Sequence, residues 1–416
     1  MLLEYSCQNY KSILDKIVFS MCASSENKNT YTSDKFNILK SAIIYGANGS
    51  GKSNFINSLN YLKSLVLNSL NHLPNINILQ HTHKLGMEKD SIYELKFIKN
   101  NIYYYYKIVL NSGRVRAESL FYSPNKRITK IFERVEDKII EGANFKGKFK
   151  ECKNVLSPNK LLLSCASVHS KVDEAIRAFN FFKDDIVFYD ASNSDNWFDY
   201  SLYKIYNNID IKKMMIKVMN ELDIPIKDIK IEIEKRKIGA VTKILDIFDE
   251  KTRQLLSEQS IDFKRASLDY GNFSIDLISE ESSGIRKLFG LLCPVLDIIK
   301  NNKILICDEF ENYLHESIIK NIIEQFNTSF FKTWNPQLIF TTHDSNLLNY
   351  NLFDRDQIWF TEIKNDNRST DIYSLLELKD IRKSEKFSSG YINGKYGAIP
   401  MINLDLIKLI GVSYEK

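Results

Sequence analysis

The chain has 416 residues, a formal net charge of +5 and a hydrophobic share of 44%, which predicts a globular protein of two or three domains. No apolar run approaches the about 20 residues that span a bilayer, and the first residues do not have the pattern of a signal peptide. We therefore expect a cytoplasmic protein without a membrane partner, in which the six scattered cysteines stay reduced.

The first 70 residues alternate between strand and helix signals. Apolar or alternating stretches at residues 2–5 and 13–19 predict strands, and the polar stretch 24–34 predicts a loop. Residues 41–45 predict a short buried strand that enters a glycine turn. Apolar residues then recur at helical spacing over residues 53–70.

The middle of the chain has a different pattern. Alternating stretches broken by short polar turns over residues 92–140 predict an antiparallel meander. Residues 160–221 are mainly helical in pattern, and strand-like stretches follow at residues 229–234, 241–248 and 273–279.

The final third returns to alternating helix and strand. Helices are expected at residues 285–300 and 316–330, and strands at 303–307 and 337–341. This rhythm favours an α/β fold with a parallel sheet. We therefore predict a core at 1–85 and 271–416, an antiparallel β subdomain at 86–150, and a mainly helical insertion lobe at 151–270.

One motif matches the pattern GxxxxGK[ST] in full and lies between the strand at 41–45 and the following helix. Its glycines let backbone N–H groups surround a phosphate, and the helix N-terminus adds partial positive charge. We predict that the lysine reaches the β and γ phosphates of a nucleotide and that the serine hydroxyl binds Mg²⁺. The predicted nucleotide-binding residues are Gly46, Ala47, Asn48, Gly49, Ser50, Gly51, Lys52, Ser53 and Asn54, with Lys52 also catalytic and Ser53 a metal ligand.

Two further strands end in residues that suit phosphate hydrolysis. The strand at 303–307 leads directly into Asp308 and Glu309, at the end of the strand where ligands bind in open α/β sheets. Asp308 is predicted to hold Mg²⁺, and Glu309 to polarise the attacking water. The next strand along the chain, 337–341, leads to His343, which is then placed to contact the γ-phosphate.

These three segments, in this order, resemble the ABC-type ATPase heads of the RecF/SMC class. The stretch 280–288 resembles the signature loop of that class, which closes over ATP held by a second subunit. Residues 9–12 resemble the short basic motif of the first strand, and Gln80 lies at about the place of the Q-loop glutamine. The resemblance adds to the ATP-binding residues Lys11, Gln80, Ser282, Ser283 and Gly284, with Gln80 also a metal ligand.

More narrowly, residues 356–362 and 394–400 resemble the AAA-family ATPases of bacterial abortive-infection and phage-defence systems, the RloA-like group. This resemblance implies an ATPase with ATP and Mg²⁺ as cofactors that forms a homodimer, or a higher homo-oligomer, around ATP. It also implies regulation of a separately encoded effector such as a nuclease, because we expect no complete nuclease domain after His343. The signature stretch departs from that of transporter ATPases, since it lacks the second glycine and the following glutamine.

The main alternative is a DNA-repair or chromosome-maintenance ATPase like RecF that acts directly on DNA. A transporter ATPase and a small-molecule kinase fit less well. The tyrosine run 103–106 suits base stacking, but alternation in a hairpin also explains it. The glycines at positions 390, 394 and 397 follow a family motif for which the sequence suggests only a tight loop closing on the core.

Overall fold

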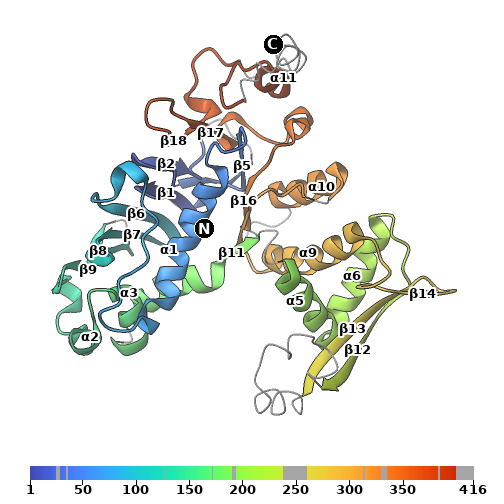
Figure 1. Ribbon diagram of the computed structural model, residues 1–416, viewed down its shortest axis with the longest axis horizontal. Helices are drawn as coiled ribbons and strands as arrows, with labels where there is room; N and C mark the ends of the chain where they lie inside the picture. Colours follow the sequence, from blue (N-terminus) through green and yellow to red (C-terminus); the bar gives the residue numbers. More distant parts are fainter. Residues whose placement is uncertain are drawn as a thin grey trace, which may run out of the picture. The chain divides into compact units, whose positions relative to one another are not determined.

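The computed structural model describes residues 1–24, 29–33, 36–125, 127–170, 172–189, 194–237, 260–312, 314–328, 335–382 and 385–399. The chain divides into two compact units (Figure 1). The first comprises the described parts of Met1–Phe188, Asn302–Phe310 and Lys320–Lys416, and the second those of Tyr189–Asn301 and Glu311–Ile319. The strand expected at 241–248 and Pro400 of the tail motif lie outside the described residues.

The first unit contains a seven-stranded antiparallel sheet. Its strands, in spatial order, are β10 (Lys138–Glu141), β9 (Thr129–Val135), β8 (Arg114–Ser123), β7 (Ile102–Asn111), β6 (Ser91–Lys99), β1 (Leu2–Gln8) and β2 (Ile17–Ser20). The predicted meander is confirmed, and β1 and β2 extend it. In β7, Tyr104 and Tyr106 are buried while Tyr103 and Tyr105 lie on the other face, so strand alternation accounts for the tyrosine run.

A six-stranded sheet forms the other layer of this unit. Its strands are β11 (Ile186–Tyr189), β15 (Ile304–Cys307), β16 (Gln337–Thr341), β5 (Ser41–Gly46), β17 (Ile358–Ile363) and β18 (Thr370–Ser374). The strands β15, β16, β5 and β17 run parallel, and β18 is antiparallel to β17. Every residue of β5, β15 and β16 is buried, as expected for parallel strands covered on both faces.

Helix α1 (Lys52–Asn68) packs against the antiparallel sheet on one side and contributes to a core shared with β5. The ring of Phe55 contacts Tyr5 and Phe19, and Phe19 in turn contacts Trp359 at the start of β17. Because β5 ends where α1 begins, this core holds both ends of the glycine loop between them.

Short helices cover the rest of the antiparallel sheet: α2 (Lys150–Val155), α3 (Leu162–Cys165) and α4 (Asp173–Asn180). The buried carboxylate of Glu118 accepts hydrogen bonds from the backbone of Leu162 and Leu163, and Phe181 stacks on Phe97 with ring centres 4.1 Å apart. These contacts place residues 151–188 in the first unit, whereas the sequence suggested an insertion lobe from residue 151.

The second unit combines helices with a three-stranded antiparallel sheet. Its elements are α5 (Ser194–Asn207), α6 (Ile209–Glu221), β12 (Asp228–Lys237), β13 (Ser260–Asp269), β14 (Ser274–Asp276) and α9 (Ser283–Lys300). Helices α5 and α9 approach closely at Gly290, where the hydroxyl of Ser201 donates to the Gly290 carbonyl at 3.0 Å. The unit therefore extends beyond residue 270 and includes the predicted signature stretch.

Several expected elements differ in their bounds. The strand expected at 13–19 is only Ile17–Ser20, because residues 9–13 form a turn held by the buried side chain of Asn9. Part of the expected loop 24–34 forms a hairpin of β3 (Thr30–Ser33) and β4 (Phe36–Leu39). The strand expected at 273–279 stops at Asp276, whose carboxylate accepts backbone hydrogen bonds from Ile278 and Ser279 and so forms a turn.

Helix α10 (Glu316–Asn327) is confirmed within the expected span 316–330, and the tail adds α11 (Phe387–Ile392). No strand was predicted for β11, β13, β17 or β18, and β11 interrupts the stretch 160–221 that was expected to be mainly helical. Within the described ranges, no helix is both long enough and apolar enough to span a membrane.

Candidate functional site: a phosphate loop beside an acidic strand end

The glycine loop connects the buried strand β5 to helix α1, as the motif predicts. Gly51 has φ of +104°, in the left-handed region that favours glycine, and a Cβ there would overlap the side chain of Thr370. A Cβ at Gly46 would overlap Thr361 and the hydroxyl of Ser50. The backbone of this loop is therefore packed so closely against β17 and β18 that these two positions accept only glycine.

The loop presents backbone donors at the start of α1. Among the residues that the structure describes, none accepts a hydrogen bond from the backbone N–H of Gly49 or Gly51. No negatively charged side chain occupies the first turn of α1. Unpaired N–H groups and the positive end of the helix dipole attract an anion, so this loop is built for phosphate.

Lys52 is held within the loop. Its ammonium donates to the carbonyl of Gly46 at 2.6 Å and to that of Ala47 at 3.2 Å, and the residue is only 5% exposed. The positive charge is therefore at the beginning of the loop, before a phosphate arrives. Ser53 and Asn54 follow on the first turn and are half-buried.

A second group of side chains lies where β15 and β16 end. The hydroxyl of Thr341 donates to the Asp308 carboxylate at 2.6 Å and accepts from the backbone N–H of Glu309 at 2.8 Å. Glu309 has φ of +50°, a conformation that costs energy for a residue with a side chain. Thr341 therefore fixes the direction of both acidic residues.

His343 follows two residues after Thr341. Its Nε2 lies 3.9 Å from a carboxylate oxygen of Glu309, and the two side chains are 39% and 45% exposed. This separation is longer than a hydrogen bond, so these two atoms lie near each other without bonding to one another. The structure thus brings the predicted residues Asp308, Glu309 and His343 to one edge.

The same edge carries the phosphate loop, because β16 lies between β15 and β5 and all three run parallel. Two strand spacings separate β15 from β5, which is about 10 Å. A nucleotide with its phosphates in the loop would therefore have its terminal phosphate beside the acidic strand end.

The donor atoms at this edge fit Mg²⁺. Across the described ranges, no cluster of three or more His, Cys, Asp or Glu side chains could hold a metal alone. The Ser53 hydroxyl and the Asp308 carboxylate are hard oxygen ligands of the kind that Mg²⁺ takes when phosphate oxygens and water complete its shell. Ser53 and Asp308 would thus hold the ion together with the nucleotide.

Lys11 and Gln80 both have contacts outside the phosphate loop, and the Lys11 ammonium lies over the ring of Tyr10, 5.6 Å from its centre. Lys11 lies in the turn before Ser12, whose hydroxyl accepts from Asn54 on α1 at 2.7 Å. The side-chain oxygen of Gln80 accepts from the backbone N–H of Gly113 at 2.6 Å, and its amide nitrogen contacts Ser91 at 3.4 Å. These bonds tie Gln80 to the antiparallel sheet, and its role at the nucleotide remains a prediction.

The predicted signature residues belong to the second unit. Ser282 caps α9, since its hydroxyl accepts from the backbone N–H of Ile285 at 3.2 Å, and Ser282 and Ser283 are exposed. The preceding turn is built on Asp276. Burial opposes the charge of this carboxylate, but hydrogen bonds from Arg265, Ser279 and Ile278 outweigh burial and lower its pKa to about 2. The N-terminus of α9, with Gly284 in its first turn, therefore starts from a well-ordered turn.

The tail motif packs beside the phosphate loop. The ring of Tyr391, in α11, lies 5.1 Å from that of Tyr45 and 5.6 Å from that of Phe360. Burial raises the pKa of Tyr391, and a hydrogen bond with the Gly46 backbone lowers it in part. The hydroxyl of Tyr373 donates to the carbonyl of Tyr396 at 2.8 Å. The motif thus covers the ends of β5 and β17, which is more specific than the tight loop expected from sequence.

The sequence did not identify four residues that shape the site: Ser12, Thr341, Thr361 and Thr370. Thr341 ends a buried strand next to the predicted histidine, which is a signal that could have been used. Thr361 lies within the tail stretch that carries the family resemblance. Ser12 and Thr370 are 358 positions apart in sequence, and no local pattern connects them.

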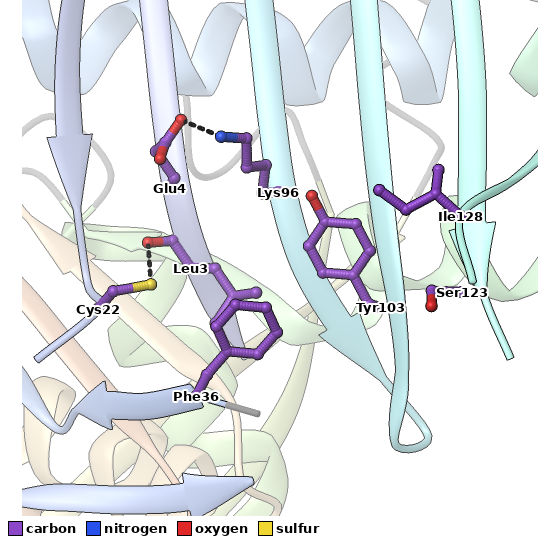
Figure 2. A pocket seen from close by; sticks show the side chains of 8 residues that line it. All are labelled: Leu3, Glu4, Cys22, Phe36, Lys96, Tyr103, Ser123 and Ile128. Carbon is purple, nitrogen blue, oxygen red and sulfur yellow. Dashed lines mark hydrogen bonds and ion pairs between the residues drawn. The ribbon is translucent and has the colours of Figure 1, made fainter. Parts of the chain in front are cut away.

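A separate hollow lies on the opposite face of the antiparallel sheet from α1. Figure 2 shows Phe36, Tyr103 and Leu3 around it, with the ion pair between Glu4 and Lys96 at one side. Its volume is about 250 Å³, and none of the predicted site residues lines it. Glu4 and Tyr5 point to opposite faces of β1, and it is Tyr5 that bonds to Ser58 of α1. The hollow is therefore distinct from the phosphate loop.

Comparison with known families identifies the class of this fold and site. A family model described as "AAA domain, putative AbiEii toxin, Type IV TA system" matches residues 41–349. This match covers most of the chain and includes the phosphate loop, the acidic strand end and the histidine. The chain therefore belongs to this family of AAA domains, and the predicted membership of an AAA-family P-loop ATPase class is confirmed.

Solved structures give a more distant likeness. One is an SMC head bound to the C-winged helix domain of ScpA, with 13% identity, 90% of this chain and 97% of that chain covered, and a TM-score of 0.42. Another is the SMC head domain from Thermotoga maritima, with 13% identity, coverage of 90% and 98%, and a TM-score of 0.40. No curated protein gives a significant match. The predicted α/β fold, with a phosphate loop and an antiparallel meander, is confirmed by the strand order and by the family match. The assignment to ABC-type heads of the RecF/SMC class stays a prediction.

Proposed function

We propose that this protein is an ATP-binding and ATP-hydrolysing switch that closes around ATP and Mg²⁺ as a dimer. The observation that carries the proposal is the shared edge of the parallel sheet. There the unpaired N–H groups of the phosphate loop and Lys52 lie two strands away from Asp308 and Glu309. A loop that binds phosphate beside a carboxylate that can orient water is the arrangement that ATP hydrolysis needs.

Each residue then has a defined task. The loop N–H groups and Lys52 hold the phosphates, and bound Mg²⁺ neutralises charge on the β and γ phosphates. Glu309 orients and polarises the attacking water, while Asp308 and Ser53 hold the ion. His343, 3.9 Å from Glu309, is close enough to contact the terminal phosphate or the same water.

The dimer rests on the exposed start of α9. Ser282 and Ser283 are exposed at a helix N-terminus, where backbone N–H groups can receive an anion from outside the chain. In the proposed closed state this end of one copy contacts the ATP held by the other. Hydrolysis removes the shared phosphate contact and lets the two copies separate.

We further propose a role in bacterial defence against phage, in which the ATPase controls a separately encoded effector such as a nuclease. The support is the family description, which names a putative toxin of a toxin–antitoxin system, together with the resemblance of the tail to abortive-infection ATPases. Direct action on DNA is the alternative, and the mild net charge of +5 neither demands nor excludes it.

Light scattering on the purified Glu309→Gln variant tests the switch, because this variant is expected to hold ATP without hydrolysing it. We expect a dimer with ATP and Mg²⁺ and a monomer without them. Ser283→Arg, which places a bulky charge on the exposed start of α9, should keep ATP binding and lose the dimer. An ATP-independent oligomeric state in both variants would contradict the proposal.

The same ATP-locked variant separates the two biological roles. Salt-dependent binding to DNA at low ionic strength would favour the RecF-like alternative. Protection of cells against phage that requires both Glu309 and a neighbouring nuclease gene, without DNA binding by this chain, would favour the defence role.

A further inference from the structure

A chain of hydrogen bonds connects the phosphate loop to the turn that follows β1. The hydroxyl of Thr370, at the start of β18, lies 3.0 Å from the carbonyl oxygen of Ser50 and 2.7 Å from the hydroxyl of Ser12. The amide nitrogen of Asn54, on the first turn of α1, lies 2.7 Å from the same Ser12 hydroxyl. The Thr370 backbone N–H also donates to the Ser12 carbonyl at 2.7 Å.

Counting the hydroxyl protons gives this chain of hydrogen bonds a direction. A carbonyl only accepts, so the single hydroxyl proton of Thr370 goes to Ser50. Thr370 must then accept from Ser12, and Ser12 accepts from the amide of Asn54. The hydrogen bonds therefore run one way, from Asn54 through Ser12 and Thr370 to Ser50. Removing any member takes one hydrogen bond away from each of its neighbours, in a place that is at least partly buried.

The Ser50 end of this chain of hydrogen bonds sets the orientation of one peptide group of the phosphate loop. In a trans peptide the C=O and the next N–H point in opposite directions, so holding the Ser50 carbonyl toward Thr370 turns the Gly51 N–H away from it. That N–H is one of the donors with no protein acceptor among the described residues. The Ser50 side chain is fixed as well, because its hydroxyl lies 2.6 Å from that of Thr361.

The other end of this chain of hydrogen bonds, at Ser12, lies in a strained turn. Asn9 and Lys11 have φ of +57° and +47°, which is costly for residues other than glycine. The turn is maintained by the fully buried side chain of Asn9, which donates to the carbonyls of Gly86 and Lys89 at 2.8 and 2.9 Å. Ser12 thus presents its hydroxyl from a rigid support.

We infer that Thr370 is a positioning residue of the phosphate loop, and that its hydroxyl holds the Ser50–Gly51 peptide in the orientation that receives a phosphate. The inference rests on the proposed nucleotide binding. Nothing in the phosphate-loop motif assigns a role to a strand that begins more than 300 residues later in the chain. Thr370 acts through Ser50, and its side chain, with the hydroxyl oxygen nearest, occupies the space that a side chain at Gly51 would need.

Thr370→Val tests the inference, because valine keeps the shape and removes the donor. We expect full-length Thr370→Val, in a Glu309→Gln background that prevents turnover, to bind ATP about 10-fold more weakly by calorimetry. Thr370→Ser, which keeps the hydroxyl, should bind within about 3-fold of the parent. Thr129→Val, the same change on β9 of the antiparallel sheet, is the matched control and should bind as the parent does.

A double-mutant cycle separates positioning from general destabilisation. Ser12→Ala should weaken binding less than Thr370→Val, and adding it to Thr370→Val should have little further effect, since both changes break one chain of hydrogen bonds. Binding of inorganic pyrophosphate should fall by a factor similar to that for ATP, because the loss concerns phosphate contacts only. If Thr370→Val fails to fold, Ser12→Ala and the pyrophosphate titration still decide the question.

The outcomes are distinct. A parent protein that binds no ATP would overturn the proposed function, and this inference with it. A parent that binds ATP, together with a folded Thr370→Val variant of equal affinity, would overturn the inference alone. Fully additive losses in the cycle, or a Thr370→Ser variant as weak as the valine variant, would also overturn it.

Discussion

The phosphate loop and the acidic strand end lie on one edge of the same sheet, but the protein holds them differently. Ser50 and Lys52 are 3% and 5% exposed, and each has a hydrogen bond of 2.6 Å. The side chains of Glu309 and His343 are 45% and 39% exposed, and His343 Nε2 lies 3.9 Å from a carboxylate oxygen of Glu309. The loop is therefore held by short, buried hydrogen bonds, whereas the side chains at the acidic strand end are more exposed to solvent.

The largest effect that would sharpen this comparison is on hydrolysis. Glu309→Gln should lower steady-state ATP hydrolysis by about 10²- to 10⁴-fold, because glutamine cannot act as a base toward water. ATP affinity should stay within about 3-fold, because the phosphate loop is unchanged. Phosphate release and calorimetry measure the two quantities, and Glu136→Gln at the β9–β10 turn is the control. Hydrolysis that survives in Glu309→Gln would show that another group activates the water.

Loss of the loop lysine should weaken ATP binding, which Glu309→Gln should leave nearly unchanged. Lys52→Ala removes a buried ammonium and its charge-assisted hydrogen bonds, so ATP binding should weaken by roughly 10- to 100-fold. Lys130→Ala, on β9, removes an equal charge elsewhere and should leave binding unchanged. Unaltered affinity in Lys52→Ala would mean that the loop N–H groups alone hold the phosphates, contrary to the assignment made here.

Thr341→Val tests the support under the acidic residues. Valine keeps the volume of this fully buried side chain but leaves Asp308 without a donor and the Glu309 N–H without an acceptor. We expect kcat to fall about 10-fold with ATP affinity nearly unchanged, since the hydrogen bonds of the Thr341 hydroxyl go to Asp308 and Glu309 rather than to the loop. A change in affinity with kcat preserved would place Thr341 with the binding half of the site instead.

The smallest expected effect concerns the turn before α9. Asp276→Asn should lower the free energy of unfolding at pH 7 by about 1–3 kcal/mol, because the carboxylate accepts several hydrogen bonds, one of them from Arg265. The pKa of Asp276 is lowered to about 2 in the folded chain, so its carboxylate stabilises the fold above the ordinary pKa near 4.

That contribution should be lost as the pH falls from about 4 toward 2. Urea denaturation followed by circular dichroism, from pH 7 downward, should show the wild type and Asp276→Asn converging over this range. Asp210→Asn in the first turn of α6 is the control and lacks this network. A difference that stays constant with pH would mean that shape, rather than charge, accounts for the role of Asp276.

Local sequence was sufficient to predict a feature wherever that feature depends on residues close together in the chain. The motif from Gly46 to Ser53 predicted the loop, because its glycines and lysine act within one turn of backbone. The antiparallel meander was equally readable, since alternation along β6, β7 and β8 repeats the two faces of the sheet. Asp308 and His343 could be singled out because Asp308 directly follows one buried strand and His343 lies two residues after the end of the next.

The sequence by itself therefore determined the class of fold, the phosphate loop and the edge at which the acidic residues gather. Only the tertiary structure decided that Thr361 and Thr370 hold the loop, that Asn9 bends the chain after β1, and that Gln80 bonds to the antiparallel sheet. The physical reason is that a hydrogen bond between residues 12 and 370 depends on the packing of two sheets around α1. No propensity or spacing along the chain records such a contact.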